Sequence, residues 1–320
     1  MAGILVLGSL NVDFVVTAEV RPGPGETVTG SSFRIHPGGK GANQAVAAAR
    51  AGGTVSMAGR VGDDSFSSVL KNSLHESGVS QDLVFQTPGT STGCAVITVD
   101  KSGENSIVVV PGANGLVGSE DVDRLFDAAC SGKKTLYEAV LLQLEIPLPS
   151  VLRAMEMAHR CGIPVMLDPA PAPSPGRELP LDKLRFVDTI MPNRHEASVL
   201  TGRHVHDVES AALAAKDLLG FGVKRAIVKL GDMGAVMGEG DCLRHVPGFK
   251  VEAVDTTAAG DTFAGALAVR LVEGSSLHQA CIFANAAGAI SVTRPGAQPS
   301  MPYRSEIQEF IRERLGDTYG

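Results

Sequence analysis

Short apolar runs alternate with helical segments along most of this chain, and that alternation restricts the fold more than any other feature. The apolar runs occupy residues 4–7, 55–58, 139–144, 164–167, 187–191 and 226–229, and helical stretches at 43–52, 65–76, 149–161, 193–200 and 207–221 lie between them. Three further helices are expected at 260–273, 277–292 and 303–315. Runs this short, ended by turn residues, are typical of buried strands. The alternation predicts an α/β fold with a mostly parallel sheet and helices on both of its faces.

Two segments, 14–35 and 92–111, break the alternation. The first is interrupted by a Pro-Gly-Pro-Gly run, and the second contains two β-rich runs, 94–99 and 106–110, joined by a short polar turn. A polar turn between two such runs predicts a hairpin. We interpret the two segments as a small separate β-layer beside the main sheet, placed to act as a lid.

Composition and charge exclude several classes of protein. Hydrophobic residues make up 44% of the chain and predict a large core, whereas the net charge of -7 argues against a general nucleic-acid binder. The first residues lack the basic segment of a signal peptide, and no apolar run approaches the ~18 residues that span a bilayer. We therefore expect a cytoplasmic protein without a membrane partner.

The chain has five cysteines, at positions 94, 130, 161, 242 and 281, and none belongs to a Cys-x-x-Cys pair. An odd number without such pairs argues against a disulfide framework or a zinc ribbon. The expectation is therefore five unpaired cysteines that act as buried apolar residues in a reducing compartment.

The segment DTTAAGDTFAGA at 255–266 predicts a strand end, a turn of small residues and the start of a helix. Backbone N–H groups at a helix start attract anions, and the small side chains of Ala258, Ala259 and Gly260 would let a phosphate approach them. Asp261, in the first turn, would then be placed to accept a proton from an attacking hydroxyl. The alternative is that Asp261 only caps the helix.

The glycine-rich segment PGGKGANQ is not a P-loop, because Arg34 and Gly41 stand where that motif needs Gly and Ser or Thr. Its backbone and the Asn43 amide could instead bind substrate hydroxyls, although many turns between a strand and a helix are rich in glycine. Asn11 and Asp13 follow the first strand, and ligands of such folds bind beyond the carboxyl ends of strands. The alternative for these two residues is an Asx turn.

Three weaker patterns each allow two interpretations. Asn193 and Glu196 begin a helix, so they could associate with a phosphate-bound Mg²⁺ or form a capping box. The turn at 229–234 could bind a nucleotide or be a simple hairpin turn. His204 and His206 could bind a metal ion, but an exposed surface loop accounts for them more readily.

Taken together and in order, the motifs resemble those of the ribokinase-like (PfkB) family of carbohydrate kinases. They are GSLNVD, PGGKGANQA, LLQLE, DPAPA, MPNRHEA, KLGDMG, VDTTAAGDTFAGA and SVTRPGAQPS, and they extend from Gly8 to about Pro302. The resemblance implies a three-layer α/β/α fold in one domain, 1–320, with a discontinuous β lid from about 12–37 and 91–111. It also implies transfer of a phosphoryl group from ATP to the terminal hydroxyl of D-ribose, giving ribose 5-phosphate. Mg²⁺ and K⁺ are the implied metal cofactors, and a homodimer joined through the lid is the implied assembly.

The resemblance further implies a role for each matching residue. The catalytic set is Asp261 as general base with an anion hole at Ala258, Ala259 and Gly260. The sugar-binding set is Asn11, Val12, Asp13, Gly39, Lys40, Gly41, Ala42, Asn43, Glu145 and Asp261. The nucleotide-binding set is Asn193, Lys229, Leu230, Gly231, Asp232, Met233, Gly234, Gly260 and Asn285. The monovalent-cation set is Asp255, Thr257, Ser291, Arg294, Gly296 and Ser300, and Glu196 is associated with Mg²⁺.

The chain departs from the family pattern in two places near this site. Asp168 stands where ribose-directed members commonly have Asn, and Arg194-His195 replaces smaller or acidic residues. Alternatives within the class are kinases for deoxyribose, a fructose-type sugar or adenosine. Few aromatic residues near the lid, Phe14 and Phe33 among them, argue against a nucleoside, whose base needs stacking partners. A non-catalytic sugar-binding protein is a further alternative, and an oxidoreductase is disfavoured because no GxGxxG follows the first strand.

Overall fold

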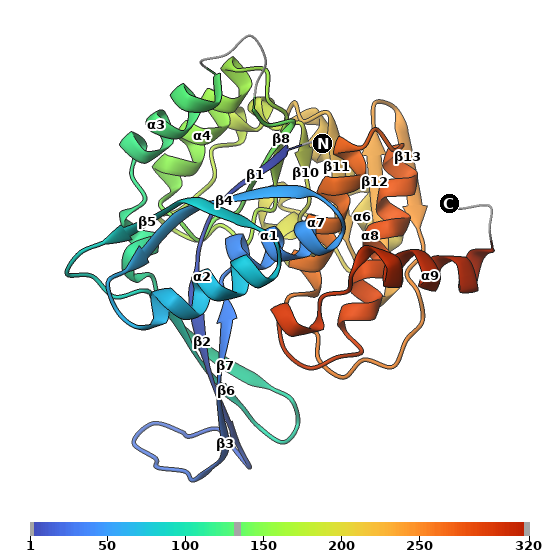
Figure 1. Cartoon of the computed structure of the whole chain (residues 1–320). Helices are drawn as coiled ribbons and strands as arrows, with labels where there is room; N and C mark the ends of the chain where they lie inside the picture. Colours follow the sequence, from blue (N-terminus) through green and yellow to red (C-terminus); the bar gives the residue numbers. More distant parts are fainter. Residues whose placement is uncertain (1–2, 131–135, 317–320) are drawn as a thin grey trace.

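The computed structural model describes residues 3–130 and 136–316, and within them nine strands form one twisted sheet (Figure 1). In spatial order the strands are β13 (Cys242–Val246), β12 (Ala235–Glu239), β11 (Arg225–Lys229), β10 (Thr189–Ile190), β9 (Val165–Leu167), β8 (Ala139–Leu142), β1 (Gly3–Leu7), β4 (Thr54–Gly62) and β5 (Ser80–Thr87). The strands from β5 to β11 run parallel, and β12 pairs antiparallel with both β11 and β13. The prediction of a mostly parallel sheet is confirmed.

Helices cover both faces of this sheet. One face carries α1 (Lys40–Arg50), α2 (Phe66–Glu76), α7 (Ala259–Val272), α8 (Leu277–Ser291) and α9 (Arg304–Leu315); the other carries α3 (Ser119–Cys130), α4 (Leu148–Arg160), α5 (Arg194–Thr201) and α6 (Val208–Gly220). Because helices cover both faces of the sheet, the three-layer α/β/α architecture is confirmed.

No helix in the described residues is long and apolar enough to cross a bilayer.

Strand β1 shows how the sequence builds two cores from one strand. Ile4 and Val6 point into the core beneath α1 and α7, whereas Leu5 and Leu7 point into the core beneath α3 and α4. Successive side chains of a strand alternate between faces, so a strand that is covered on both sides must be apolar throughout. Each fully buried side chain of this kind contributes roughly 1.5–3 kcal/mol.

Small residues allow α1 and α7 to pack closely. A Cβ added to Gly265 would lie 2.7 Å from the Cβ of Ala47, which is too close for any side chain. The Gly- and Ala-rich sequences of both helices therefore bring their backbones together. This contact sets the first turn of α7 against the first turn of α1, where the candidate site lies.

A second sheet projects from the main body as a four-stranded layer (Figure 1). Its strands, in spatial order, are β3 (Gly30–Gly38), β2 (Asn11–Ala18), β6 (Gly93–Val99) and β7 (Asn105–Val110). The β6–β7 pair is the predicted hairpin, with Val99 opposite Asn105 at its turn. The expected small β-layer is confirmed.

The structure also contains elements that the apolar patterns do not predict. These are β5, α3, and the antiparallel pair β12–β13 at the edge of the main sheet. Strand β13 has exposed residues at Cys242, Leu243 and Arg244, so it shows no apolar run. Helix α1 begins at Lys40, three residues before the predicted start at 43. Its first turn lies in the glycine-rich segment, which has no apolar periodicity.

The prediction of five unpaired, buried cysteines is wrong. Cys130 and Cys161 form a disulfide that joins the C-terminal ends of α3 and α4. Cys242 is exposed and Cys94 is half-buried, so only Cys281 fits the expectation. The two bonded cysteines are 31 residues apart in sequence, and the packing of α3 against α4 brings their Cα atoms to 5.9 Å. The argument for a reducing compartment depended on five unpaired cysteines, and the disulfide removes that support.

Candidate active site

The glycine-rich turn before α1 lies directly on the link between β1 and β2. Gly39 has φ 86° and ψ 133°, and a Cβ there would lie 2.6 Å from the backbone nitrogen of Asn11. A Cβ on Gly41 would lie 2.6 Å from the backbone nitrogen of Ser9. Only glycine permits these approaches. The turn therefore brings the residues 39–43 and Asn11 to one end of the main sheet.

Glu145 closes this turn from a distant part of the chain. Its Oε2 accepts hydrogen bonds from the Ser9 hydroxyl at 2.5 Å and from the Lys40 backbone N–H at 3.0 Å. Lys40 is the first residue of α1, and Gly39 before it offers no capping side chain. A carboxylate at a helix start satisfies an unpaired N–H and opposes the positive end of the dipole. Glu145 thus supports the turn, and its contact with the sugar stays a prediction.

Asn11 and Asp13 are held by tertiary contacts. Asn11 Oδ1 accepts a hydrogen bond from Asn114 Nδ2 at 2.7 Å. The Asp13 carboxylate lies over Gly38, where a Cβ would come within 2.2 Å of Oδ2. Burial raises the pKa of Asp13 to about 7, and the negative charges of Glu145 and Asp261 add to the rise. The coupling shows that Asp13 shares its surroundings with Asp261.

Asp261 lies in the first turn of α7 and is only 5% exposed. Its Oδ2 accepts a hydrogen bond from Asn43 Nδ2 at 3.1 Å, and its Oδ1 accepts one from Gln44 Nε2 at 3.0 Å. Burial raises the pKa of Asp261, and the Lys40 ammonium offsets part of that rise. Because its bonds go to side chains of α1, we interpret Asp261 as part of the site rather than as a helix cap.

The turn that precedes Asp261 has a special backbone. Ala258 adopts a left-handed conformation with φ 58°, the only positive φ outside glycine among the described residues. Such conformations cost about 1–3 kcal/mol and persist where surrounding structure requires them. The turn leads the chain into the start of α7 at Ala259, and the Ala259 N–H already donates to the Thr256 carbonyl at 3.3 Å.

The capping-box interpretation of Asn193 and Glu196 is confirmed. Asn193 Oδ1 accepts the Glu196 N–H at 2.9 Å, and Glu196 Oε2 accepts the Asn193 N–H at 2.7 Å. Asn193 Nδ2 also donates to Glu196 Oε1 at 2.8 Å. Burial raises the pKa of Glu196, and the charge of Lys229 opposes that rise. Asn193 and Glu196 also line a polar cavity, so the capping box is compatible with a place in the candidate site.

The turn at 229–234 connects β11 to the antiparallel strand β12, so it is a hairpin turn. Leu230 N–H donates to the Gly234 carbonyl at 2.8 Å, and Gly234 has φ 87°. Lys229 and Gly231 also line the cavity, which leaves the nucleotide-binding interpretation open. The hairpin interpretation is therefore confirmed, and nucleotide binding by this turn stays a prediction.

A polar cavity of about 500 Å³ joins these segments. Its lining residues are Lys40, Asp168, Ala170, Asn193, Arg194, His195, Glu196, Lys229, Gly231, Thr256, Ala258, Ala259, Gly260 and Asp261. Asn11 and Asp13 do not line it, and Asn285 uses its amide to donate to the carbonyls of Val246 and Pro247. The cavity lies beyond the carboxyl ends of parallel strands, where ligands of open α/β sheets bind.

The loop before α7 is joined to the segment 291–300. Asp255 Oδ1 accepts the Thr257 N–H at 2.9 Å, and Asp255 Oδ2 accepts the Gly296 N–H at 2.8 Å. Burial alone would raise the pKa of Asp255, but these hydrogen bonds hold it below its ordinary value. Ser291 and Ser300 donate to local carbonyls, and Arg294 pairs with Glu306.

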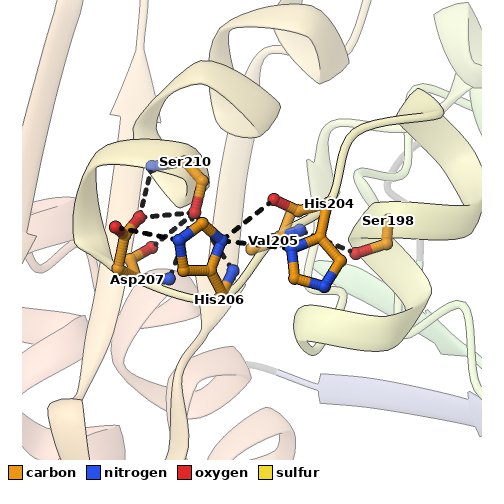
Figure 2. A network of polar contacts seen from close by, with 6 residues as sticks. All are labelled: Ser198, His204, Val205, His206, Asp207 and Ser210. Atoms are coloured by element: carbon orange, nitrogen blue, oxygen red, sulfur yellow. Dashed lines mark hydrogen bonds and ion pairs between the residues drawn. The ribbon is translucent and has the colours of Figure 1, made fainter.

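His204 and His206 form a surface network away from the cavity lining (Figure 2). Their Nδ1 atoms are 3.2 Å apart, and His206 Nε2 lies 3.3 Å from Asp207 Oδ2. Asp207 and Ser210 form the capping box of α6. Across residues 3–130 and 136–316, no three His, Cys, Asp or Glu side chains group to hold a metal ion. His204 and His206 are both exposed and lie in the loop between α5 and α6, so the surface-loop interpretation is confirmed.

Sequence reasoning missed the side chains that orient the predicted site residues. Gln143 Nε2 donates to Gln44 Oε1 at 2.6 Å, and Gln44 Nε2 donates in turn to Asp168 and Asp261. Asn114 orients Asn11 in the same way. The motif PGGKGANQA includes Gln44, but nothing in its local pattern identifies Gln44 as a partner of two carboxylates.

The fold and site define a class of α/β protein that places a buried carboxylate, a helix start and two lysines around one polar cavity of about 500 Å³. This arrangement of groups is typical of a phosphoryl-transfer enzyme. The family model described as "pfkB family carbohydrate kinase" matches residues 1–304, and the chain belongs to this family. The family resemblance of the sequence is thereby confirmed.

The similarity to known proteins extends over almost the whole chain. The chain is 42% identical to a ribokinase of Haemophilus influenzae over 96% of this chain and 98% of that protein. It is 39% identical to a deoxyribokinase of Salmonella typhi over 96% of this chain and 98% of that protein. Among solved structures, Arabidopsis thaliana ribokinase complexed with ribose and ATP matches with a TM-score of 0.86 and 33% identity, over 98% of this chain and 99% of that one.

Proposed function

We propose that the protein transfers the γ-phosphoryl group of ATP to the terminal hydroxyl of D-ribose, giving ribose 5-phosphate and ADP. The observation that carries the proposal is the buried carboxylate of Asp261 beside the start of α7, at the cavity that Lys40 and Lys229 also line. The relatives of known activity support ribose as the acceptor.

In this mechanism Asp261 orients the sugar hydroxyl and accepts its proton as the oxygen attacks phosphorus. Its raised pKa makes it a stronger base than an ordinary carboxylate, and Asn43 and Gln44 keep it in place. The backbone N–H groups of Ala258 and Gly260 oppose the negative charge of the transferring group, and the Ala259 N–H, which donates to the Thr256 carbonyl at 3.3 Å, would have to turn toward it. Positioning and electrostatics supply most of the rate enhancement in such transfers.

We assign Mg²⁺ to the side of the cavity formed by Asn193 and Glu196. A bound Mg²⁺ would neutralise charge on the β- and γ-phosphates of ATP. Both carboxylate oxygens of Glu196 are occupied by Asn193, so Glu196 fits a role through metal-bound water. Gly231 and neighbouring turn residues would face the nucleotide.

Release of ADP with a panel of acceptors tests the proposed function. We expect the highest kcat/KM with ribose, and lower values with deoxyribose, fructose and adenosine. A preference for deoxyribose would move the protein toward the activity of its Salmonella relative. A protein that binds ribose but releases no ADP with any acceptor would be the non-catalytic alternative.

We expect ribose binding to strengthen as the pH rises through 7. The pKa of Asp13 is raised to about 7, and an ionised carboxylate accepts hydrogen bonds from sugar hydroxyls better than a protonated one. For a single group with this pKa, affinity should increase about tenfold between pH 6 and pH 8. Calorimetry without nucleotide measures the change, and equal affinity at both pH values would remove Asp13 from ribose binding.

We propose a K⁺ site formed by Asp255, Thr257 and the segment 291–300. Asp255 already ties its own loop to Gly296, and this loop leads directly into 258–260. Backbone carbonyls suit a weakly charged monovalent cation, and such a site needs no cluster of acidic side chains. K⁺ is expected to raise kcat several-fold over tetramethylammonium at equal ionic strength. Equal rates in the two salts would contradict the proposal.

We propose that the small sheet closes over the sugar and joins two copies of the chain. One face of this sheet exposes Phe33, Ile35, Val96, Val108 and Val110, a large apolar area for a monomer. A second copy of the same sheet would cover these side chains symmetrically. Light scattering should give twice the chain mass of 33.2 kDa, and a monomer at micromolar concentration would contradict this assembly.

A further inference from the structure

Asp168 is a buried charged side chain of the cavity to which the proposed mechanism gives no role. It follows β9 and is 1% exposed. Its Oδ1 accepts a hydrogen bond from Lys229 Nζ at 2.7 Å, and its Oδ2 accepts one from Gln44 Nε2 at 2.8 Å. A buried carboxylate is retained at this cost only where its partners are well placed. The two partners come from different elements, Lys229 from the end of β11 and Gln44 from α1.

The first partner, Lys229, has its ammonium group beside the start of α7. A Cβ added to Gly260 would lie 3.5 Å from Lys229 Nζ. A cation is unfavourable at this end of a helix, because the dipole and the unpaired N–H groups are also positive there. Asp168 supplies the negative charge that holds the ammonium in this position. An anion entering between Lys229 and the helix start would be attracted by both.

The second partner, Gln44, connects Asp168 to Asp261. Gln44 Nε2 donates to Asp168 Oδ2 and, at 3.0 Å, to Asp261 Oδ1. Gln44 Oε1 accepts from Gln143 Nε2 at 2.6 Å, so the amide group is held in the orientation that donates to the carboxylates. Asp168, Gln44 and Asp261 therefore form one connected network, and a change at Asp168 reaches the proposed base.

We propose that Asp168 is a positioning residue that holds the Lys229 ammonium against the phosphoryl group being transferred. The inference rests on the proposed kinase function. It gives Asp168 a role that the family motifs do not imply for it. Asp168 also keeps Lys229 from pairing with Asp261 or Glu196, the other carboxylates that line the cavity. Asp261 then remains available to the sugar hydroxyl. Asp stands at position 168 where ribose-directed members of the family commonly have Asn, and its charge pairs with the lysine at position 229.

A double-mutant cycle on Asp168 and Lys229 tests the proposal. Asp168→Asn keeps the size of the side chain and an oxygen for Gln44, but removes the charge. We expect it to lower kcat about tenfold or more, with the KM for ribose changed less than about twofold. Lys229→Met should lower kcat by a similar factor. The double variant should be no worse than Lys229→Met alone, because Asp168 acts through Lys229.

Nucleotide binding provides a second readout that a purely structural role would not change. Lys229→Met and Asp168→Asn should each weaken binding of a non-hydrolysable ATP analogue about tenfold while ADP binding stays within about twofold. Such a difference places the ammonium at the γ-phosphate. The ion pair of Lys224 and Asp188 provides the matched control, since Lys224 immediately precedes the same strand, β11, and lies outside the cavity. Asp188→Asn should leave both affinities and kcat unchanged.

Two results would overturn the inference while leaving the proposed function intact. One is additive losses in the cycle, and the other is equal weakening of ADP and the ATP analogue. Failure of the unmodified protein to phosphorylate any sugar would instead remove the proposed function. The unmodified protein is assayed with ribose and ATP first, so the two failures are distinguished.

Discussion

Asp261→Asn is expected to lower kcat for ribose phosphorylation by about 10²-fold or more, the range for loss of a general base. The substituted amide cannot accept the proton of the attacking hydroxyl. Ribose affinity should change by no more than about threefold, because in the proposed site the sugar is held mainly by Asn11, Asp13 and the turn at 39–43. Steady-state ADP release measures kcat, and calorimetry measures ribose binding.

Thermal unfolding supplies the control for Asp261→Asn. Burial raises the pKa of Asp261, so its ionised form destabilises the folded state at neutral pH relative to an ordinary exposed carboxylate. Removing the charge relieves this cost, but the amide nitrogen of Asn would face one of the two amide donors, Asn43 or Gln44, so Tm should stay close to that of the unmodified protein. Loss of activity with a preserved or higher Tm assigns the effect to chemistry. Turnover close to that of the unmodified protein would show that Asp261 is not the base.

Gly39→Ala is expected to raise the KM for ribose by about tenfold or more. The residue has φ 86° and ψ 133°, a backbone conformation that residues other than glycine rarely adopt. The added Cβ would lie 2.6 Å from the Asn11 backbone nitrogen. The strain alone costs about 1–3 kcal/mol, and the clash must push the turn away from β2. Both sides of the proposed sugar site would move. Initial rates at varied ribose and fixed saturating ATP measure the effect.

Gly78→Ala is the matched control for this substitution. Gly78 also has a positive φ of 74°, but nothing lies within 4 Å of an added Cβ. It should lower Tm through backbone strain and leave the KM for ribose unchanged. Similar KM values for Gly39→Ala and the unmodified protein would show that the turn does not determine sugar binding.

The sequence predicted the main architecture because the signals for it are local. A parallel strand buried on both faces must be apolar over several consecutive residues, and Ile4, Leu5, Val6 and Leu7 display this directly. The β6–β7 hairpin was predicted for the same reason, since two β-rich runs flank a polar turn. Elements without such a signal, such as the exposed strand β13, were missed.

Local patterns left each polar residue with two interpretations, and the tertiary structure separated them. Asp261 bonds Asn43 and Gln44, which lie 218 and 217 residues away in the chain, so it is not explained as a cap. Asn193 and Glu196 form the capping box and also line the cavity. In the second case the capping box is confirmed, and the association with a phosphate-bound Mg²⁺ stays a prediction that the position at a helix start allows.

The sequence by itself therefore determined the alternation of strands and helices, the small second sheet, and the family to which the motifs belong. Only the tertiary structure showed the ion pair of Asp168 with Lys229, its link to Asp261 through Gln44, and the Cys130–Cys161 disulfide. The physical reason is range. Strand and helix patterns repeat within a few residues, whereas a buried charge is stabilised by whichever side chains the fold brings within about 3 Å.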